Sequence, residues 1–205
     1  MKKALVGLAL VLAAGCTIAG LGSGPVALAS PAAMQAGPAA YSVDTGHSSV
    51  LFRIKHNDVS WFYGRFNTFN GNFSFDPGSG EITGVDVTVD AESVDTGNKR
   101  RDDHLRSPDF FSSKEFPAIS FKSTSLRKTG ENTFEVTGDL SLHGVTKQIT
   151  VPLEVTGAAS GRRGPVAGIH STFTFARSDY GMNFMVGAGL GDEVTIIVSL
   201  QGKGS

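Results

Sequence analysis

The stretch FEVTGDLSL at residues 134–142 decides the fold class of this chain. Its large apolar side chains, at Phe134, Val136, Leu140 and Leu142, alternate with polar ones. A period of two places every second side chain on the same face, so the stretch predicts a β-strand with one buried face. The same alternation recurs at residues 50–55, 69–75, 85–89, 149–155, 169–175 and 194–200. The chain is therefore predicted to be all-β.

Turn-forming residues separate these predicted strands. They lie at residues 76–78 (DPG), 129–132 (TGEN), 143–144 (HG) and 157–164. Gly, Pro, Asn and Asp favour the backbone angles of tight turns. Residues 98–107 differ, because they are mostly charged, lack β-branched residues and end before Pro108, and they predict one short helix. Seven or eight antiparallel strands at this spacing form either a two-sheet sandwich or a closed barrel.

The phenylalanine content favours the barrel. The chain has 14 Phe against three Tyr and one Trp, and Phe fills or lines a dry interior without offering a hydrogen bond. An eight-stranded barrel is just wide enough to be filled by its own side chains or to hold one slender ligand. The prediction is an eight-stranded antiparallel barrel with one short helix, and the pattern leaves open whether its interior is filled or hollow.

The N-terminal residues predict export. Two lysines precede an apolar run that is too short to span a bilayer, and small residues lead to a cleavage position after Ala29. Residues 1–29 are therefore predicted to be a signal peptide, residues 30–40 a flexible leader and residues 41–205 the folded domain. We expect a periplasmic or secreted protein.

Cys16 supports an alternative to simple cleavage. The small residues before it look like a lipoprotein processing site, which would leave the protein anchored through an acylated Cys16. It is the only cysteine of the chain, so the predicted mature domain has no disulfide. No later apolar run is long enough for a transmembrane segment. Without the two signal-peptide lysines the net charge is about −3, which disfavours nucleic acid and anionic membrane surfaces as partners.

No catalytic or metal-binding constellation stands out in the sequence. The five His residues lack a metal-binding spacing such as i and i+4 on a helix. Asp44, His47 and Ser48 have the residue types of a hydrolase triad, but a strand sends His47 and Ser48 to opposite faces. We therefore expect neither a catalytic site nor a metal site.

The inner strand faces supply candidates for contact with a ligand. These candidates are Phe52, Ile54, Phe69, Phe73, Val87, Val89, Phe121, Phe134, Leu140, Val151, Phe173 and Val198. Each either contacts a ligand or belongs to an ordinary core, and the pattern does not distinguish the two. Further candidates lie in non-strand segments that can cover the mouth of a barrel. They are Phe110, Phe111 and Met182, with Phe116, Phe184 and Met185 near them.

Several motifs follow one another in a fixed order between residues 41 and 200. The most specific run is SVDTGN at 93–98, followed by RDDHLRS at 101–107 and DFF at 109–111. YSVD at 41–44, GDLSLHGVTK at 138–147 and RSDYG at 177–181 extend the series. Together these motifs resemble the YceI-like family of exported polyisoprenoid-binding proteins. The aromatic run at residues 61–63 (WFY) departs from that family's pattern.

The resemblance implies a lipocalin-like barrel, often dimeric, that holds a polyisoprenoid or quinone-like lipid and has no other cofactor and no catalytic residue. It implies that Arg101, Asp102 and His104 tie the predicted helix to the barrel rim or touch a polar head group, of which we favour the first. The main hypothesis is an exported, non-enzymatic lipid carrier. The alternatives are a structural or stress-related envelope protein with a filled core, and a hydrolase or isomerase that acts on such a lipid through His47 or His104.

Overall fold

The computed structural model describes residues 37–204 of the 205-residue chain. The predicted signal peptide, its cleavage site and Cys16 lie outside the described residues. Of the predicted leader, residues 37–40 are described, and Ala39 and Ala40 already belong to the first strand. The folded domain therefore begins slightly earlier than the sequence pattern indicated.

Eleven strands, one α-helix and three 3-10 helices make up the described part of the chain. In order they are β1 (Ala39–Val43), η1 (Thr45–His47), β2 (Ser49–His56), β3 (Ser60–Phe66), β4 (Phe69–Asp76), β5 (Glu81–Asp90), η2 (Ala91–Ser93), β6 (Val94–Asp95), α1 (Lys99–Arg106), β7 (Ala118–Lys128), β8 (Thr133–Leu142), β9 (Val145–Gly161), β10 (Gly164–Ala176), η3 (Arg177–Tyr180) and β11 (Leu190–Gly204). The predicted helix is confirmed as α1. Within residues 37–204, no helix has the length and apolar character needed to cross a bilayer.

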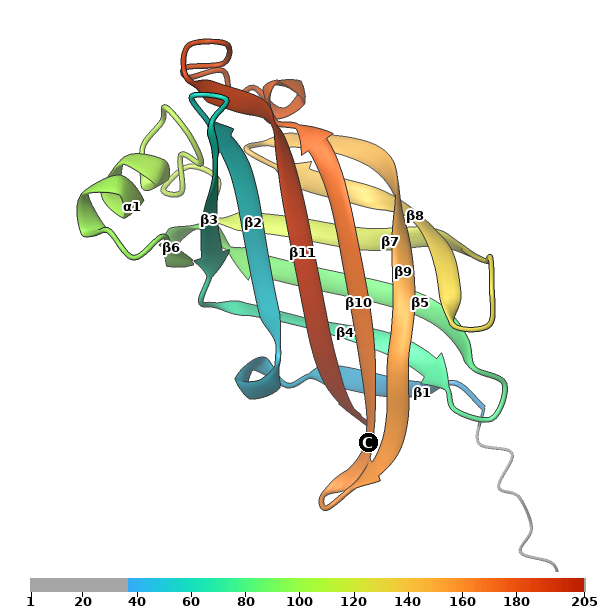
Figure 1. The fold of residues 1–205 in the computed structure, drawn as a ribbon. Coiled ribbons are helices and arrows are strands. Elements are labelled where there is room, and N and C mark those ends of the chain that lie inside the picture. The colour runs from blue at the N-terminus through green and yellow to red at the C-terminus, as the bar shows by residue number, and fades with distance from the viewer. Residues whose placement is uncertain (1–36, 205) are drawn as a thin grey trace, which may run out of the picture. The chain divides into compact units, whose positions relative to one another are not determined.

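Eight of the strands form a closed antiparallel barrel. Around the ring they follow the order β1, β4, β5, β7, β8, β9, β10 and β11. Strand β1 closes the ring, because it pairs with β4 on one side and with the C-terminal part of β11 on the other, where Tyr41 lies opposite Gly204. The predicted eight-stranded antiparallel barrel with one short helix is confirmed (Figure 1).

Strand β11 pairs with two different strands along the same edge. Strand β1 pairs with the C-terminal part of β11, whereas β2 pairs with β11 nearer its N-terminus, over residues 190–199. Strand β3 pairs with β2, and the two-residue β6 pairs with β3. Helix α1 lies beside β6, away from β1 (Figure 1). These additional elements surround the end of the barrel opposite β1.

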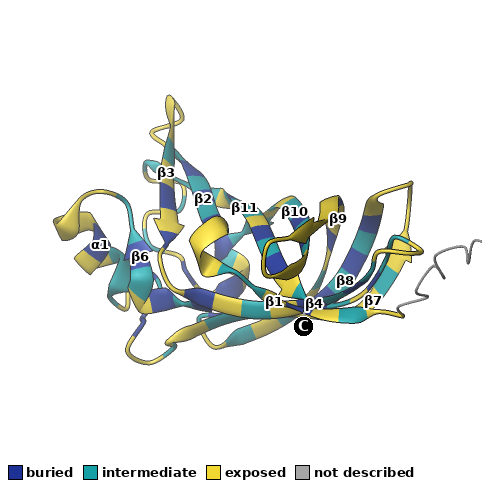
Figure 2. Cartoon of the chain, turned by 90° about the horizontal axis from the view of Figure 1, so that it is seen from below, coloured by how far each residue is buried: buried dark blue, intermediate teal, exposed yellow. Residues whose placement is uncertain are grey.

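The end of the barrel next to β1 is filled by its own side chains. Tyr41 stacks on Phe73 with 5.4 Å between the ring centroids, and both residues are buried. Gly202 of β11 makes room for them, since a Cβ at this position would lie 2.7 Å from the Phe73 ring. Along the strands, buried positions alternate with exposed ones, as a period of two requires (Figure 2).

The predicted turn at residues 157–164 is wrong in extent. Strand β9 continues to Gly161 and β10 begins at Gly164, so only Arg162 and Arg163 connect the two strands. The small residues between 157 and 161 keep their ladder pairing with β10. Glycine disfavours a strand without preventing it, and the ladder pairing decides the structure here.

Candidate functional site

A cavity of about 470 Å³ occupies the half of the barrel away from β1. Its walls are the inner faces of β2, β3, β5, β7, β8, β9, β10 and β11, and most of the lining side chains are apolar. The volume lies in the range of small-molecule binding sites, which is about 300–1,000 Å³. The barrel is therefore hollow at one end and filled at the other.

The cavity reaches the surface beside α1. Five of its lining residues are exposed, namely His56, Ser60, Arg101, His104 and Met185. They come from the end of β2, the start of β3, α1 and the loop before β11. We call this end, where α1, the β2–β3 hairpin and residues 182–190 meet, the mouth of the cavity. Polar groups gather there while the interior stays apolar.

Twelve of the fifteen residues predicted to contact a ligand line this cavity. They are Phe52, Ile54, Val87, Val89, Phe110, Phe111, Phe121, Leu140, Val151, Phe173, Met182 and Val198. The other three, Phe69, Phe73 and Phe134, do not line it and are buried in the core. The sequence pattern of an inner-face Phe is the same whether the side chain borders a cavity or packs in a filled core. Phe73 packs in the core because Tyr41 and Gly202 contact it.

Other lining residues were not among the predicted ones, namely Phe62 and Phe66 from β3 and Leu105 from α1. Phe184 and Met185, which were expected near the mouth, line the cavity from the loop before β11. Phe62 was hidden because exposed aromatic residues flank it on both sides, which masks the period of two. Val50, Val136, Leu153, Ile169 and Ile196 continue alternations that were already recognised, and extending each series would have found them.

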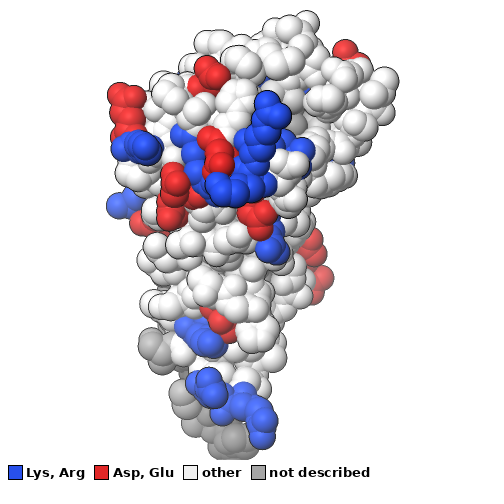
Figure 3. Space-filling model, turned by 90° about the vertical axis from the view of Figure 1, so that its left-hand side faces the viewer, with Lys and Arg blue, Asp and Glu red and all other residues white. Residues whose placement is uncertain are grey.

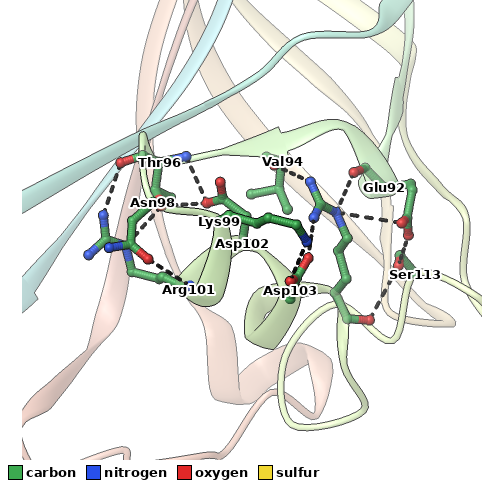
Figure 4. Close-up of polar contacts among 10 residues, drawn as sticks. Glu92, Val94, Thr96, Asn98, Lys99, Arg101, Asp102, Asp103 and Ser113 are labelled. Atoms are coloured by element: carbon green, nitrogen blue, oxygen red, sulfur yellow. Dashed lines mark hydrogen bonds and ion pairs between the residues drawn. The ribbon is translucent and has the colours of Figure 1, made fainter.

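Helix α1 is bonded to Thr96 in the connection that leads into it from β6. The Asn98 side chain caps the helix by accepting a hydrogen bond from the Arg101 amide at 3.2 Å. Asp102 is buried, and its carboxylate accepts bonds from the amide, at 2.9 Å, and the hydroxyl of Thr96. The Arg101 guanidinium donates to the Thr96 hydroxyl at 2.8 Å and to its carbonyl at 2.9 Å (Figure 4).

Arg106 provides a second attachment of the helix. Its guanidinium donates to the carbonyl oxygens of Glu92 at 2.7 Å and of Val94 at 2.8 Å. It also contacts Asp103, whose pKa is lowered chiefly by a hydrogen bond from Lys99. Arg101 and Asp102 thus bond to Thr96 within the connection between β6 and α1, and Arg106 links the helix to η2 and β6, so the tie to the barrel rim stays a prediction. Charged side chains of both signs gather on the face that carries α1 (Figure 3).

His104 lies within an aromatic cluster at the mouth. Its Nε2 is 2.9 Å from the Asp109 carboxylate, so its polar contact is within its own segment rather than with the rim. The ring packs edge-on against Phe110 and Phe184, with centroids 5.1 and 5.2 Å away. Arg101 lies over the Phe62 ring at 4.1 Å. The mouth therefore combines aromatic surface with two groups that can donate hydrogen bonds.

Arg177 holds the loop on the other side of the mouth. Only 2% of this residue is exposed, and its guanidinium donates to the carbonyl oxygens of Met182, Phe184 and Gly191 at 2.8, 2.8 and 2.9 Å. Burial lowers the pKa of Arg177 from its usual value, and the charge of Asp192 partly opposes this. Residues 181–191 are thus fixed from inside by one charged side chain.

Asp44, His47 and Ser48, which have the residue types of a hydrolase triad, stabilise the junction between β1 and β2. His47 Nδ1 lies 2.8 Å from the Asp44 carboxylate, which also contacts Lys203 at 2.9 Å. The Ser48 hydroxyl donates to the Asp44 carbonyl at 2.7 Å and accepts from the Gln201 amide at 3.0 Å. The hydroxyl is committed to the backbone, and the group lies outside the cavity lining. This arrangement does not activate a nucleophile.

Comparisons with known proteins agree with this architecture. The model of the YceI-like domain matches residues 41–202. A UPF0312 protein of Ectopseudomonas mendocina is 38% identical over 171 residues, which cover 82% of this chain and 89% of the relative. The crystal structure of Burkholderia cenocepacia BcnA superposes with a TM-score of 0.70 at 26% identity, covering 78% of this chain and 98% of BcnA.

A more distant structure shares the same fold. A polyisoprenoid binding domain from Saccharophagus degradans, implicated in plant cell wall breakdown, superposes with a TM-score of 0.63 at 17% identity. The match covers 82% of this chain and 99% of that domain. The motifs of residues 93–111, the barrel and the family model thus point to one assignment. The chain belongs to the YceI-like family.

Proposed function

We propose that this protein is a lipid carrier that holds a polyisoprenoid or a similar long-chain amphiphile, such as a quinone-like lipid, in the barrel cavity. The observation that carries the proposal is the cavity itself, which is apolar inside, polar at its mouth and closed at its far end. Burial of an apolar chain contributes about 25 cal/mol per Å² removed from water, so the tail needs no charged partner. The head group would lie at the mouth, near Arg101 and His104.

The fold and the sequence support a carrier rather than an enzyme. A domain of the same fold is described as polyisoprenoid binding, and the residues that resemble a triad are used to join β1 to β2. A filled core would leave no cavity, so the structural or stress-related alternative has less support. The proposed site of action is the cell envelope, because residues 1–29 read as a signal peptide, with Cys16 as the alternative point of attachment.

Native mass spectrometry combined with organic extraction tests this proposal. The protein would be purified from its own envelope without detergent, and we expect one prenyl lipid per barrel. A clean mass of the unliganded protein under gentle conditions would overturn the carrier function. The mass of the intact chain also reports whether it begins at Ser30 or at an acylated Cys16.

A pair of variants locates the ligand within the barrel. Val87→Trp places an indole in the hollow half, and we expect it to abolish copurification of the lipid or select a shorter tail. Phe73→Leu is the matched control, because Phe73 belongs to the filled end. This variant should lose stability, by about 1 kcal/mol, yet retain the lipid. Equal retention in both variants would place the ligand outside the cavity.

A further inference from the structure

The exposed apolar side chains of the described residues gather at one place. Four large hydrophobic residues are exposed among residues 37–204: Val59 by 81%, Tyr63 by 52%, Met185 by 45% and Trp61 by 41%. Val59, Trp61 and Tyr63 come from the β2–β3 hairpin, and Met185 comes from the loop before β11. We call these four residues the mouth patch. Single exposed apolar residues are ordinary, whereas a cluster of this kind marks an interaction surface.

The mouth patch is continuous with the cavity. Successive side chains of a strand point to opposite faces, and in β3 Ser60 and Phe62 line the cavity while Trp61 and Tyr63 are exposed. Met185 belongs to both surfaces, since it lines the cavity and is exposed. A ligand that leaves the cavity beside Phe62 therefore emerges at the edge of the mouth patch.

The hairpin tip and the neighbouring loop are joined into one unit. Asn57 and Asp58 both have positive φ, 50° and 57°, as a tight hairpin turn requires. The Val59 amide donates to the His56 carbonyl at 3.2 Å, and the Asn57 amide donates to the Gly189 carbonyl at 2.7 Å. The patch is thus presented on a fixed backbone, which reduces the entropy lost on binding.

Two cations hold the indole of Trp61 in place. Arg53 Cζ and Lys55 Nζ lie 4.4 and 4.7 Å from the centre of the indole ring, within the range of cation–π contacts. Neither cation is in an ion pair within the part of the chain that the structure describes. Asp58 at the turn is the acidic residue of the hairpin tip. Glu193 of β11 lies exposed near Lys55 at the irregularity between β11 and β2. Arg53 and Lys55 form no ion pair with these acidic residues and can contact an anionic group, although the predicted mature chain has a net charge of about −3.

We infer that the mouth patch docks the protein on a phospholipid bilayer containing anionic lipid, so that the mouth opens toward the membrane that supplies or receives the ligand. The inference rests on the proposed lipid-carrier function. Trp and Tyr favour the membrane–water interface, because each has an apolar ring with a polar group. Val59 and Met185 add apolar area that enters the head-group region, while Arg53 and Lys55 remain beside the lipid phosphates.

Trp61 is itself the reporter for this inference, since it is the only Trp of the chain. The protein is mixed with vesicles of phosphatidylethanolamine and phosphatidylglycerol, and its tryptophan emission is recorded. We expect a shift to shorter wavelength and quenching by lipids with brominated chains. Vesicles of phosphatidylcholine alone should bind more weakly, because they lack the anionic component. An unchanged emission with both kinds of vesicle would overturn the inference.

Two double variants locate the docking surface. Val59→Ser with Tyr63→Ser keeps Trp61 as reporter, changes exposed positions only, and should weaken vesicle partitioning about tenfold or more. Arg162→Gln with Arg163→Gln is the control, because it removes two cations from the β9–β10 turn at the other end of the barrel. If the control variant alone loses vesicle binding, the docking surface lies at that turn and the inference is wrong.

A loading assay separates this inference from the proposed function. The Val59→Ser, Tyr63→Ser protein should still take up a polyprenol offered in detergent, as judged by native mass spectrometry, while uptake from vesicles slows. Normal uptake from vesicles would refute docking and leave the carrier function intact, whereas absence of uptake from detergent by the unaltered protein would refute the carrier function. Dimerisation that depends on Val59 and Tyr63, without vesicle binding, would assign the patch to a second copy of the chain.

Discussion

Arg177 is a charged residue whose side chain is almost completely buried at the mouth. It donates to the carbonyl oxygens of Met182 and Phe184 in the loop before β11 and of Gly191 in β11, and these three acceptors lose their partner when the guanidinium is removed. Arg177→Met should therefore lower the free energy of unfolding by about 3 kcal/mol. Urea denaturation measures this, and amide exchange in residues 182–191 should accelerate more than exchange in β5. Uniform exchange throughout the barrel would contradict this role.

Asp44 makes the stability of the folded protein depend on pH. Its pKa falls from 3.8 to about 2, first through the hydrogen bond from Lys203 and next through His47. A carboxyl whose pKa is lower when folded stabilises the protein above its unfolded pKa, and this contribution disappears as the pH falls from about 4 to about 2. The melting temperature of the unaltered protein should drop more over that interval than that of Asp44→Asn. Parallel curves for the two proteins would contradict the assignment.

Single residues also mark how far sequence reasoning reaches. Phe52 and Phe73 occupy equivalent inner-face positions, and the pattern correctly predicted that both point inward. Phe52 borders the cavity, but Phe73 does not. The difference comes from Tyr41 and Gly202, which lie far away in the sequence and meet Phe73 only when β1 and β11 pair. The direction of a side chain follows from local periodicity, whereas the presence of a void depends on long-range packing.

At the scale of the elements, two adjacent acidic residues of α1 have different roles. Asp102 is buried and bonded to Thr96, whereas Asp103 is exposed and paired with Lys99 and Arg106. Asp102→Ala should cost about 1–3 kcal/mol of stability and speed release of a bound lipid, because the helix beside the mouth loses its bonds to Thr96. Asp103→Ala should leave the free energy of unfolding nearly unchanged, because its ion pairs are exposed to solvent. Chemical denaturation and lipid release measured on both variants test this, and equal effects would contradict it.

The strands that sequence reasoning missed have identifiable reasons. Strand β3 begins with the run from Trp61 to Tyr63, in which every residue is aromatic, so no period of two is visible. Strand β7 carries an irregularity between Ser123 and Ser125 that shifts its register with β8, and this breaks the alternation. The helix was predicted correctly because Asn98 and Pro108 frame a charged segment. The sequence thus predicts an element when its alternation or its boundaries are clear, as they are in α1, and misses a strand when several adjacent residues share one character, as in β3.

For the whole molecule, a bound lipid should act as part of the core. A ligand that binds only the folded barrel stabilises it by about 2.7 kcal/mol when its concentration is 100 times its dissociation constant. For a domain of this size that corresponds to roughly 5–10 °C in the melting temperature. Protein refolded without lipid should therefore melt lower and recover on addition of a polyprenol, and Val87→Trp should not respond. Identical melting of the lipid-free and lipid-bound protein would argue against an interior site.

The dimer implied by the family resemblance stays a prediction at the same scale. Sedimentation velocity of the delipidated protein measures it directly. A concentration-dependent dimer is the expected result, and a monomer at all concentrations would contradict it. The order of strands around the ring could not be predicted from the sequence, because the pairing of β1 with both β4 and β11 joins segments from the two ends of the domain. Local pattern determined the fold class, and long-range pairing determined the closure.

The plug formed by Tyr41 and Phe73 gives the barrel a floor, so the molecule is a cup rather than a sleeve. A tail cannot be threaded in at one end and drawn out at the other. Under the proposed carrier function, the donor and the acceptor of the lipid must therefore use the same opening, one after the other. The protein would then interact with the donor and the acceptor at different times. A lipid tail longer than the depth of the cavity would extend beyond the opening, where a membrane or another protein could bind it.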